Sequence, residues 1–90
     1  MDVQHQPEAG RFVVVVDGHE AEVNYSLDGD VLAITHTGVP GEIGGRGVAS
    51  ALVRAAFDHA RANGLKVRAL CSYAAAWSER HPEQADILVE

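Results

Sequence analysis

The amino-acid sequence predicts an α+β domain with a mostly antiparallel sheet, elements in the order β-β-β-α-β-α, and helices packed on the sheet. Three observations support this fold class. The first half contains three β-rich segments joined by short turns, the second half begins with a long amphipathic helical pattern, and one further strand and a shorter helix follow. Residues 1–10 are polar and are expected to be a flexible tail, which leaves residues 11–90 as a single domain.

The first three strands are expected to form a meander. Residues Arg11–Val16 are dominated by valine and predict a buried strand, and the Asp17–Gly18 pair after them is typical of a hairpin turn. Residues His19–Leu27 alternate between apolar and polar side chains, as a half-exposed strand does. A second turn at Asp28–Asp30 leads into a third strand, Val31–Thr37. Tight turns between successive strands make this part of the sheet antiparallel.

The second half changes from strand spacing to helical spacing after a loop that contains glycine and proline. Apolar side chains from Val48 to Ala60 recur on one helical face, and Gly64 stands where a left-handed residue ends a helix. Residues Leu65–Leu70 predict a fourth strand. The helix joins the third strand to the fourth as a crossover, so these two strands should be parallel.

A shorter helix is expected from Ser72 to His81. Ser72 is the expected N-cap, and Pro82 is expected to end the helix just after His81. Trp77 within this helix is expected to lie in the core or in the wall of a binding groove. The last residues, Ala85–Glu90, fit either a short strand or a turn of helix.

Charge, hydropathy and cysteine content exclude several classes of protein. The chain has 90 residues and a formal net charge of −6, whereas proteins that neutralise nucleic-acid backbones are usually basic. No apolar run is long enough to span a membrane, and the polar N-terminus does not resemble a signal peptide. The single cysteine permits no internal disulfide, and the histidines show no metal-site spacing. We therefore expect a cytoplasmic protein that binds neither nucleic acid nor membranes.

The segment Gly44–Ser50, with the sequence GGRGVAS, leads into the first turn of the long helix. The first turn of a helix carries unpaired N–H groups and the positive end of the helix dipole, and glycine allows an anion to approach the backbone closely. The segment therefore fits a cradle for a phosphate, with backbone donors from Gly45 through Ala49 and a charge from Arg46. Alternatively, the glycines only turn the chain. Neither the Gly-Lys-Ser/Thr of a P-loop nor a G-x-G-x-x-G motif is present.

The same segment resembles the acyl-CoA loop of the GNAT N-acetyltransferase superfamily, whose pattern is Gln/Arg-x-x-Gly-x-Gly/Ala before a long helix. Gly47 and Ala49 match the last two defined positions, whereas Gly44 stands where Gln or Arg is usual. Four stretches in order, ITHTGVP, GGRGVASALV, GLKVRALCSYAAAW and RHPE, are similar to the minimal, single-domain GNAT-like proteins. The resemblance covers residues 11–90, with a departure at Gly38, where this branch tends to carry Glu.

The resemblance implies an acetyl-CoA-dependent N-acetyltransferase that acts on an amine acceptor. The pyrophosphate of acetyl-CoA or coenzyme A would bind the loop and the helix start. The pantetheine arm would lie where the third and fourth strands splay apart, paired with backbone groups near Val39. The cofactor-binding residues that the resemblance implies are Val39, Gly44, Gly45, Arg46, Gly47, Val48, Ala49, Ser50 and Tyr73. The acceptor of these small proteins is poorly defined.

Cys71 and His36 are the candidate catalytic residues. In a GNAT geometry Cys71 would lie near the thioester, where it could accept the acetyl group or position the thioester; otherwise it is a small buried apolar residue. His36, at the end of the third strand, could act as a general base or be a hydrogen-bonded structural residue. A Cys–His pair is possible because the two strands are neighbours. Tyr73 could protonate the leaving thiolate or simply pack.

Two other functions stay open from the sequence. The chain is short and leaves little sequence for an acceptor pocket, which favours a CoA-binding module without catalysis. In a purely structural or protein-interaction domain, the glycines would only form turns and no CoA would bind. The sequence does not determine the oligomeric state, and a monomer is compatible with it.

Overall fold

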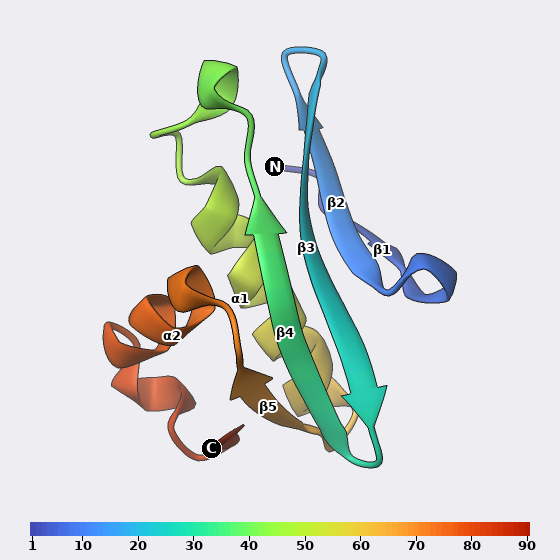
Figure 1. Cartoon of the computed structure of the whole chain (residues 1–90), viewed down its shortest axis with the longest axis vertical. Coiled ribbons are helices and arrows are strands. Elements are labelled where there is room, and N and C mark those ends of the chain that lie inside the picture. Colours follow the sequence, from blue (N-terminus) through green and yellow to red (C-terminus); the bar gives the residue numbers. More distant parts are fainter.

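Six strands form one mixed sheet in the order β1-β2-β3-β4-β5-β6, and two helices pack on it (Figure 1). The computed structural model describes all residues, 1–90. The strands are β1 (Gln4–Gln6), β2 (Arg11–Val16), β3 (His19–Asp28), β4 (Val31–Gly38), β5 (Lys66–Ala69) and β6 (Leu88–Val89). The helices are α1 (Val48–Ala62) and α2 (Ser72–Glu79), with short 3₁₀ turns η1 (Pro7–Ala9), η2 (Gly41–Ile43) and η3 (Pro82–Gln84). The predicted α+β class is confirmed.

The strand directions follow the predicted connections. The pairs from β1 to β4 are antiparallel, and β4 pairs with β5 in parallel after the α1 crossover, as expected. The C-terminal segment, for which strand and helix were both open, forms β6 and pairs in parallel with β5. No helix is long and apolar enough to cross a membrane.

The N-terminal segment differs from its expectation as a flexible tail, because it contains β1. In the pairing with β2, His5 stands opposite Phe12. The His5 ring stacks on Phe12 with 4.2 Å between ring centroids, and its Nε2 lies 2.5 Å from the Tyr25 hydroxyl. The polar N-terminal segment is therefore ordered by its pairing with β2, by Val3 and by the ring of His5, contacts that its polar composition did not indicate.

The hydrophobic core lies between one face of the sheet and the two helices. Fully buried side chains of α1, including Leu52 and Phe57, pack over buried strand residues such as Ile34. Trp77 of α2 joins this core: it is fully buried, and its ring centroid lies 4.9 Å from that of Phe57. Its indole N–H donates a 2.9 Å hydrogen bond to Ser50 Oγ. This contact fixes the N-terminal half of α1 against α2.

Helix α1 ends as predicted, whereas α2 begins with a different cap. Gly64 has a left-handed φ of 69°, and the amide of Leu65 donates to the carbonyl of Ala60 at 2.8 Å, as in a Schellman motif. The N-cap of α2 is Cys71, whose Sγ accepts from the Ala74 amide at 3.3 Å, and Ser72 is the first helical residue. The prediction of Ser72 as the N-cap was wrong, because the chain remains extended for one residue less than the capping preference suggested.

Strands β4 and β5 part at one point, and this divergence positions the site. Their ladder ends at the Ile34–Ala69 pair, while β4 continues to Gly38. The amides of Leu70 and Cys71 both donate to the Ile34 carbonyl, at 3.0 and 3.1 Å. Beyond this point the two chains share no further ladder, in agreement with the expected splay.

Candidate functional site

The glycine loop presents a run of free backbone donors at the start of α1. The first hydrogen bond of the helix runs from the amide of Ala51 to the carbonyl of Gly47 at 3.0 Å. No amide from Gly45 to Ser50 donates to an acceptor within the protein. Gly47 is the N-cap and supplies no side chain to satisfy these groups. Their alignment at the positive end of the α1 dipole makes this segment suitable for an anion.

Two glycines of the loop adopt conformations that other residues avoid. The φ angles of Gly45 and Gly47 are 76° and 77°, both left-handed. A Cβ atom at either position would meet no protein atom within 4 Å, so a ligand can approach the backbone there. Ile43, immediately before the loop, is fully buried and anchors it to the core. The loop is thus anchored at Ile43, and no side chain at Gly45 or Gly47 blocks access to its amides.

A cavity of about 280 Å³ lies beside these amides. Its lining combines the loop, the first turn of α1, the segment after β4 and the start of α2: Val39, Ile43, Gly44, Gly45, Gly47, Val48, Ala49, Ser50 and Tyr73. The structure therefore gathers every predicted cofactor-binding residue except Arg46 around one cavity. Ile43 was missed by the sequence reasoning, although a single aliphatic residue inside a glycine-rich loop is a signal for such an anchor.

Arg46 turns away from the cavity. Its Nη1 donates to Oδ2 of Asp17 in the β2–β3 turn, and the two side chains are 50% and 67% exposed. The predicted positive charge of the loop is therefore shared with a carboxylate from a distant part of the chain. Spacing along the sequence gave no sign of this partner.

Cys71 lies where β4 and β5 separate. Its Sγ is 3.3 Å from the Thr37 hydroxyl of β4 and accepts from the Ala74 amide of α2. The side chain is partly buried against the core. The thiol thus links the end of β4 to the first turn of α2, on the side of the sheet that carries the cavity. Thr37 was not singled out in the sequence.

His36 lies on the other face of the sheet. It pairs in register with Asn24, whereas its neighbour Thr37 pairs with the core residue Val23, and successive strand residues point to opposite faces. Its imidazole is exposed and folds over Gly38: Nε2 is 3.1 Å from the position of a Cβ at that glycine. The Cys–His pair, which the sequence left possible, is therefore not formed. The strands are neighbours, as predicted, but the bulge opposite Asn24 and Tyr25 inserts one extra residue after Ile34, so His36 does not share the core face of Ile34.

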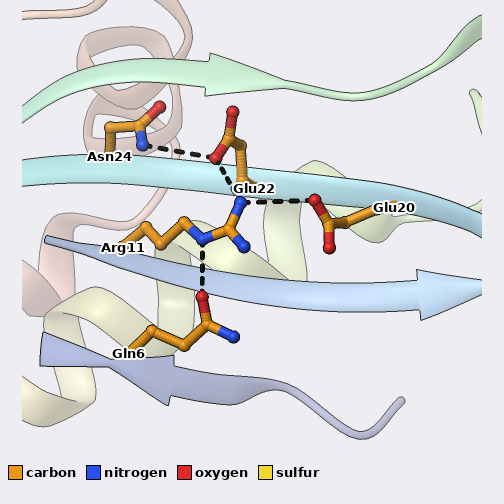
Figure 2. Close-up of polar contacts among 5 residues, drawn as sticks. All are labelled: Gln6, Arg11, Glu20, Glu22 and Asn24. Atoms are coloured by element: carbon orange, nitrogen blue, oxygen red, sulfur yellow. Dashed lines mark hydrogen bonds and ion pairs between the residues drawn. The ribbon is translucent and has the colours of Figure 1, made fainter. Parts of the chain in front are cut away.

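A polar network of Gln6, Arg11, Glu20, Glu22 and Asn24 lies across the uncovered face of the sheet (Figure 2). Arg11 donates to Gln6 Oε1 at 2.6 Å, to Glu22 Oε1 at 2.9 Å and to Glu20 Oε2 at 3.2 Å. The hydrogen bond from Arg11 holds the pKa of Glu22 below its usual value, and the charge of His36 acts in the same direction. Two carboxylates share one guanidinium group here, so this face is acidic next to His36.

The same architecture occurs in known proteins. A model of the GCN5-related N-acetyltransferase family matches residues 11–87. The chain belongs to this family. The NMR solution structure of a GCN5-like protein from Staphylococcus aureus is similar to it, with a TM-score of 0.78 and 33% sequence identity over 98% of this chain and 87% of that one. The resemblance noted in the sequence is confirmed for family and fold.

Membership of the GCN5-related N-acetyltransferase family relates the cavity, the free amides and His36 to the requirements of acyl transfer. Acyl transfer to an amine needs a place for an acyl-CoA thioester and access for an acceptor. The cavity and free amides lie on the side of the sheet covered by the helices, and His36 lies on the uncovered side. The β4–β5 ladder ends at Ile34–Ala69, and Cys71 contacts Thr37 just beyond it.

Proposed function

We propose that this GCN5-related protein binds acetyl-CoA in the cavity at the start of α1 and transfers the acetyl group to an amine. The observation that carries the proposal is the run of amides from Gly45 to Ser50 that donate to no acceptor within the protein. The first turn of any helix leaves amides unpaired, and here the unpaired run also includes the loop residues Gly45 and Arg46, so a phosphate can satisfy several of these donors at once.

The residues around the cavity fit the chemistry of coenzyme A. The amides of the loop and the first turn of α1 would hold the pyrophosphate. The Ser50 hydroxyl accepts the indole N–H of Trp77, which leaves its own proton free to donate to a phosphate oxygen. The segment at Val39, which follows β4 and has no partner strand, would pair with the pantetheine amides. Ile43 and Tyr73 supply the apolar wall.

The transfer step would take place where β4 and β5 part. The neutral amine nitrogen attacks the thioester carbonyl carbon, a C–N bond forms, and the C–S bond breaks with the electron pair leaving on sulfur. The ammonium form of the acceptor must first lose a proton, for which His36 on the uncovered face is the proposed base. The thiolate must gain a proton, for which the hydroxyl of Tyr73, a residue that lines the cavity, is the proposed donor. The new amide nitrogen releases its second proton to water, and the Tyr73 phenolate regains a proton from water. Direct attack requires no acetylated enzyme, whereas a covalent route would form an acetyl thioester on Cys71.

Calorimetric titration with acetyl-CoA tests the binding proposal, using Gly45→Ala and Gly64→Ala as a matched pair. Both glycines have left-handed φ angles, 76° and 69°, and neither Cβ would meet a protein atom. Each variant should therefore incur a similar strain, about 1–2 kcal/mol. Only Gly45→Ala should turn the loop amides, and it should weaken acetyl-CoA binding about ten-fold or more. Equal affinity of the two variants, or no binding by the wild-type protein, would refute the cradle.

A CoA-binding module without catalysis is the second candidate function. It is favoured by the separation of His36 and Cys71, which leaves no assembled nucleophile–base pair. The two functions differ in turnover. Release of free CoA thiol in the presence of a panel of primary amines, above the rate without amine, would support the transferase. Tight binding without acceptor-dependent thiol release from any of them would support the binding module.

A further inference from the structure

Arg46 is the only arginine or lysine between Arg11 and Arg54, so it is the only side-chain cation that the glycine loop can offer a phosphate. In the structure its guanidinium is already engaged, because Nη1 donates to the carboxylate of Asp17, 29 residues earlier in the chain. The β2–β3 turn that carries Asp17 and the loop before α1 lie at the same end of the molecule (Figure 1).

The two partners are held with different rigidity. Asp17 and Gly18 form a two-residue turn that closes the Val16–His19 pair, and both have positive φ angles, 51° and 79°. Turns of this kind match the twist of the flanking strands and are well defined. Arg46, in contrast, stands between Gly45 and Gly47 in a loop without regular structure. The carboxylate therefore has a fixed position, and the guanidinium is the partner that can move.

A carboxylate and a phosphate compete for the same face of a guanidinium group, because both accept its N–H donors in the plane of the fork. When Arg46 turns toward a phosphate, Asp17 loses its partner and leaves an unpaired negative charge near an anionic ligand. The chain carries a net charge of −6, so other side chains do little to offset this repulsion. Both effects weaken the binding of phosphate-bearing ligands.

We propose that Asp17 is an internal competitor for Arg46 that lowers the affinity of the cradle for coenzyme A. Arg46 is paired with Asp17 in the free protein and exchanges this carboxylate for phosphate oxygens in the complex. The inference rests on the proposed function, since it assumes that the loop binds the phosphates of acetyl-CoA. Asp17, a residue of a distant hairpin, thus controls the affinity for the ligand.

The test compares Asp17→Asn with Asp30→Asn by calorimetric titration with acetyl-CoA. Asparagine followed by glycine is a preferred sequence for this type of turn, so Asp17→Asn removes the charge and keeps the hairpin. Asp30→Asn makes the same change at the exposed β3–β4 turn, at the opposite end of these strands. Acetyl-pantetheine, which has the thioester but lacks the diphosphate, serves as the ligand without the proposed contact.

Asp17→Asn should tighten acetyl-CoA binding about two- to five-fold, the range expected for an exposed ion pair, and the gain should shrink at high salt. It should leave acetyl-pantetheine binding unchanged, and Asp30→Asn should change neither. In an Arg46→Gln background, the part of the gain that comes from competition for the guanidinium should disappear, and only the part from relieved charge repulsion should remain. Unchanged or weaker acetyl-CoA binding by Asp17→Asn would overturn the inference while leaving the proposed function intact. If the wild-type protein does not bind acetyl-CoA, both are overturned.

Discussion

The role of Cys71 can be resolved by two substitutions that separate its structural and chemical contributions. In the structure its Sγ caps α2 by accepting from the Ala74 amide at 3.3 Å and lies 3.3 Å from the Thr37 hydroxyl. Cys71→Ala removes both contacts. Cys71→Ser keeps an acceptor at the N-cap and removes the thiol, and serine is among the preferred N-cap residues.

The expected cost of Cys71→Ala follows from these contacts. Loss of a side-chain N-cap destabilises a protein by about 0.5–2 kcal/mol, typically about 1 kcal/mol. For a domain of this size, 1 kcal/mol corresponds to about 4–8 °C in Tm. Cys71→Ala should therefore melt about 4–8 °C below the wild-type protein, and Cys71→Ser should melt near it or above it, because a hydroxyl oxygen accepts a hydrogen bond better than a thiol sulfur.

Thermal unfolding followed by circular dichroism measures both variants, and acetyl transfer is then compared below their melting temperatures. If direct attack is the route, Cys71→Ser should retain transfer activity, because the cap keeps the start of α2 in place. Loss of activity in Cys71→Ser with an unchanged Tm would require the thiol itself and would favour the covalent route. A Cys71→Ser protein as destabilised as Cys71→Ala would refute the capping argument, since the two differ mainly in the acceptor at the N-cap.

Three further predictions concern stability. Ser50→Ala should lower the free energy of unfolding by about 1–3 kcal/mol, because it leaves the buried indole N–H of Trp77 without an acceptor. Urea denaturation measures this loss, and an equal loss in a Trp77→Phe background would contradict the explanation. The hydrogen bond from Arg61 lowers the pKa of Asp86 from 3.8 to about 2. The stability that the ionised Asp86 contributes should therefore be lost as the pH falls from about 4 to about 2, and the stability of Asp86→Asn should not show this loss over the same pH range. Burial lowers the pKa of His5 below 6.5, so the unfolded chain binds more protons at this position than the folded chain. Stability should therefore fall as the pH drops below 6.5, and His5→Gln should reduce the dependence of stability on pH in this range.

Much of the fold could be predicted because local sequence rules and the final structure agree. The valine-rich segment and the alternating segment became β2 and β3 with the predicted two-residue turn between them. The helical period from Val48 and the stop at Gly64 defined α1. The same agreement holds for the cradle, because glycines before a helix restrict what the backbone can do regardless of distant contacts. Most of the predicted cofactor-binding residues therefore lie around one cavity.

The incorrect expectations share a different physical origin. The strand β1 depends on the packing of His5 against a ring from another strand, which no local pattern reveals. The Cys–His pair required two side chains on neighbouring strands to face the same side. A bulge complicates that register, since Tyr25 pairs with Ile34 but Asn24 pairs with His36, one residue out of step. The engagement of Arg46 by Asp17 joins residues that only the folded hairpin brings together.

The acidic composition and the proposed anionic ligand are compatible, because the site depends on the backbone more than on side-chain charge. The cavity is lined by residues from the first turns of both helices, Val48–Ser50 of α1 and Tyr73 of α2, so two positive dipole ends border it. Neither helix has an acidic residue in its first turn to oppose this effect. A net charge of −6 argues against ligands that bind through broad basic surfaces, such as nucleic acids. It does not argue against a single pyrophosphate that binds through aligned amides, whose attraction acts at short range and is fixed by the chain path.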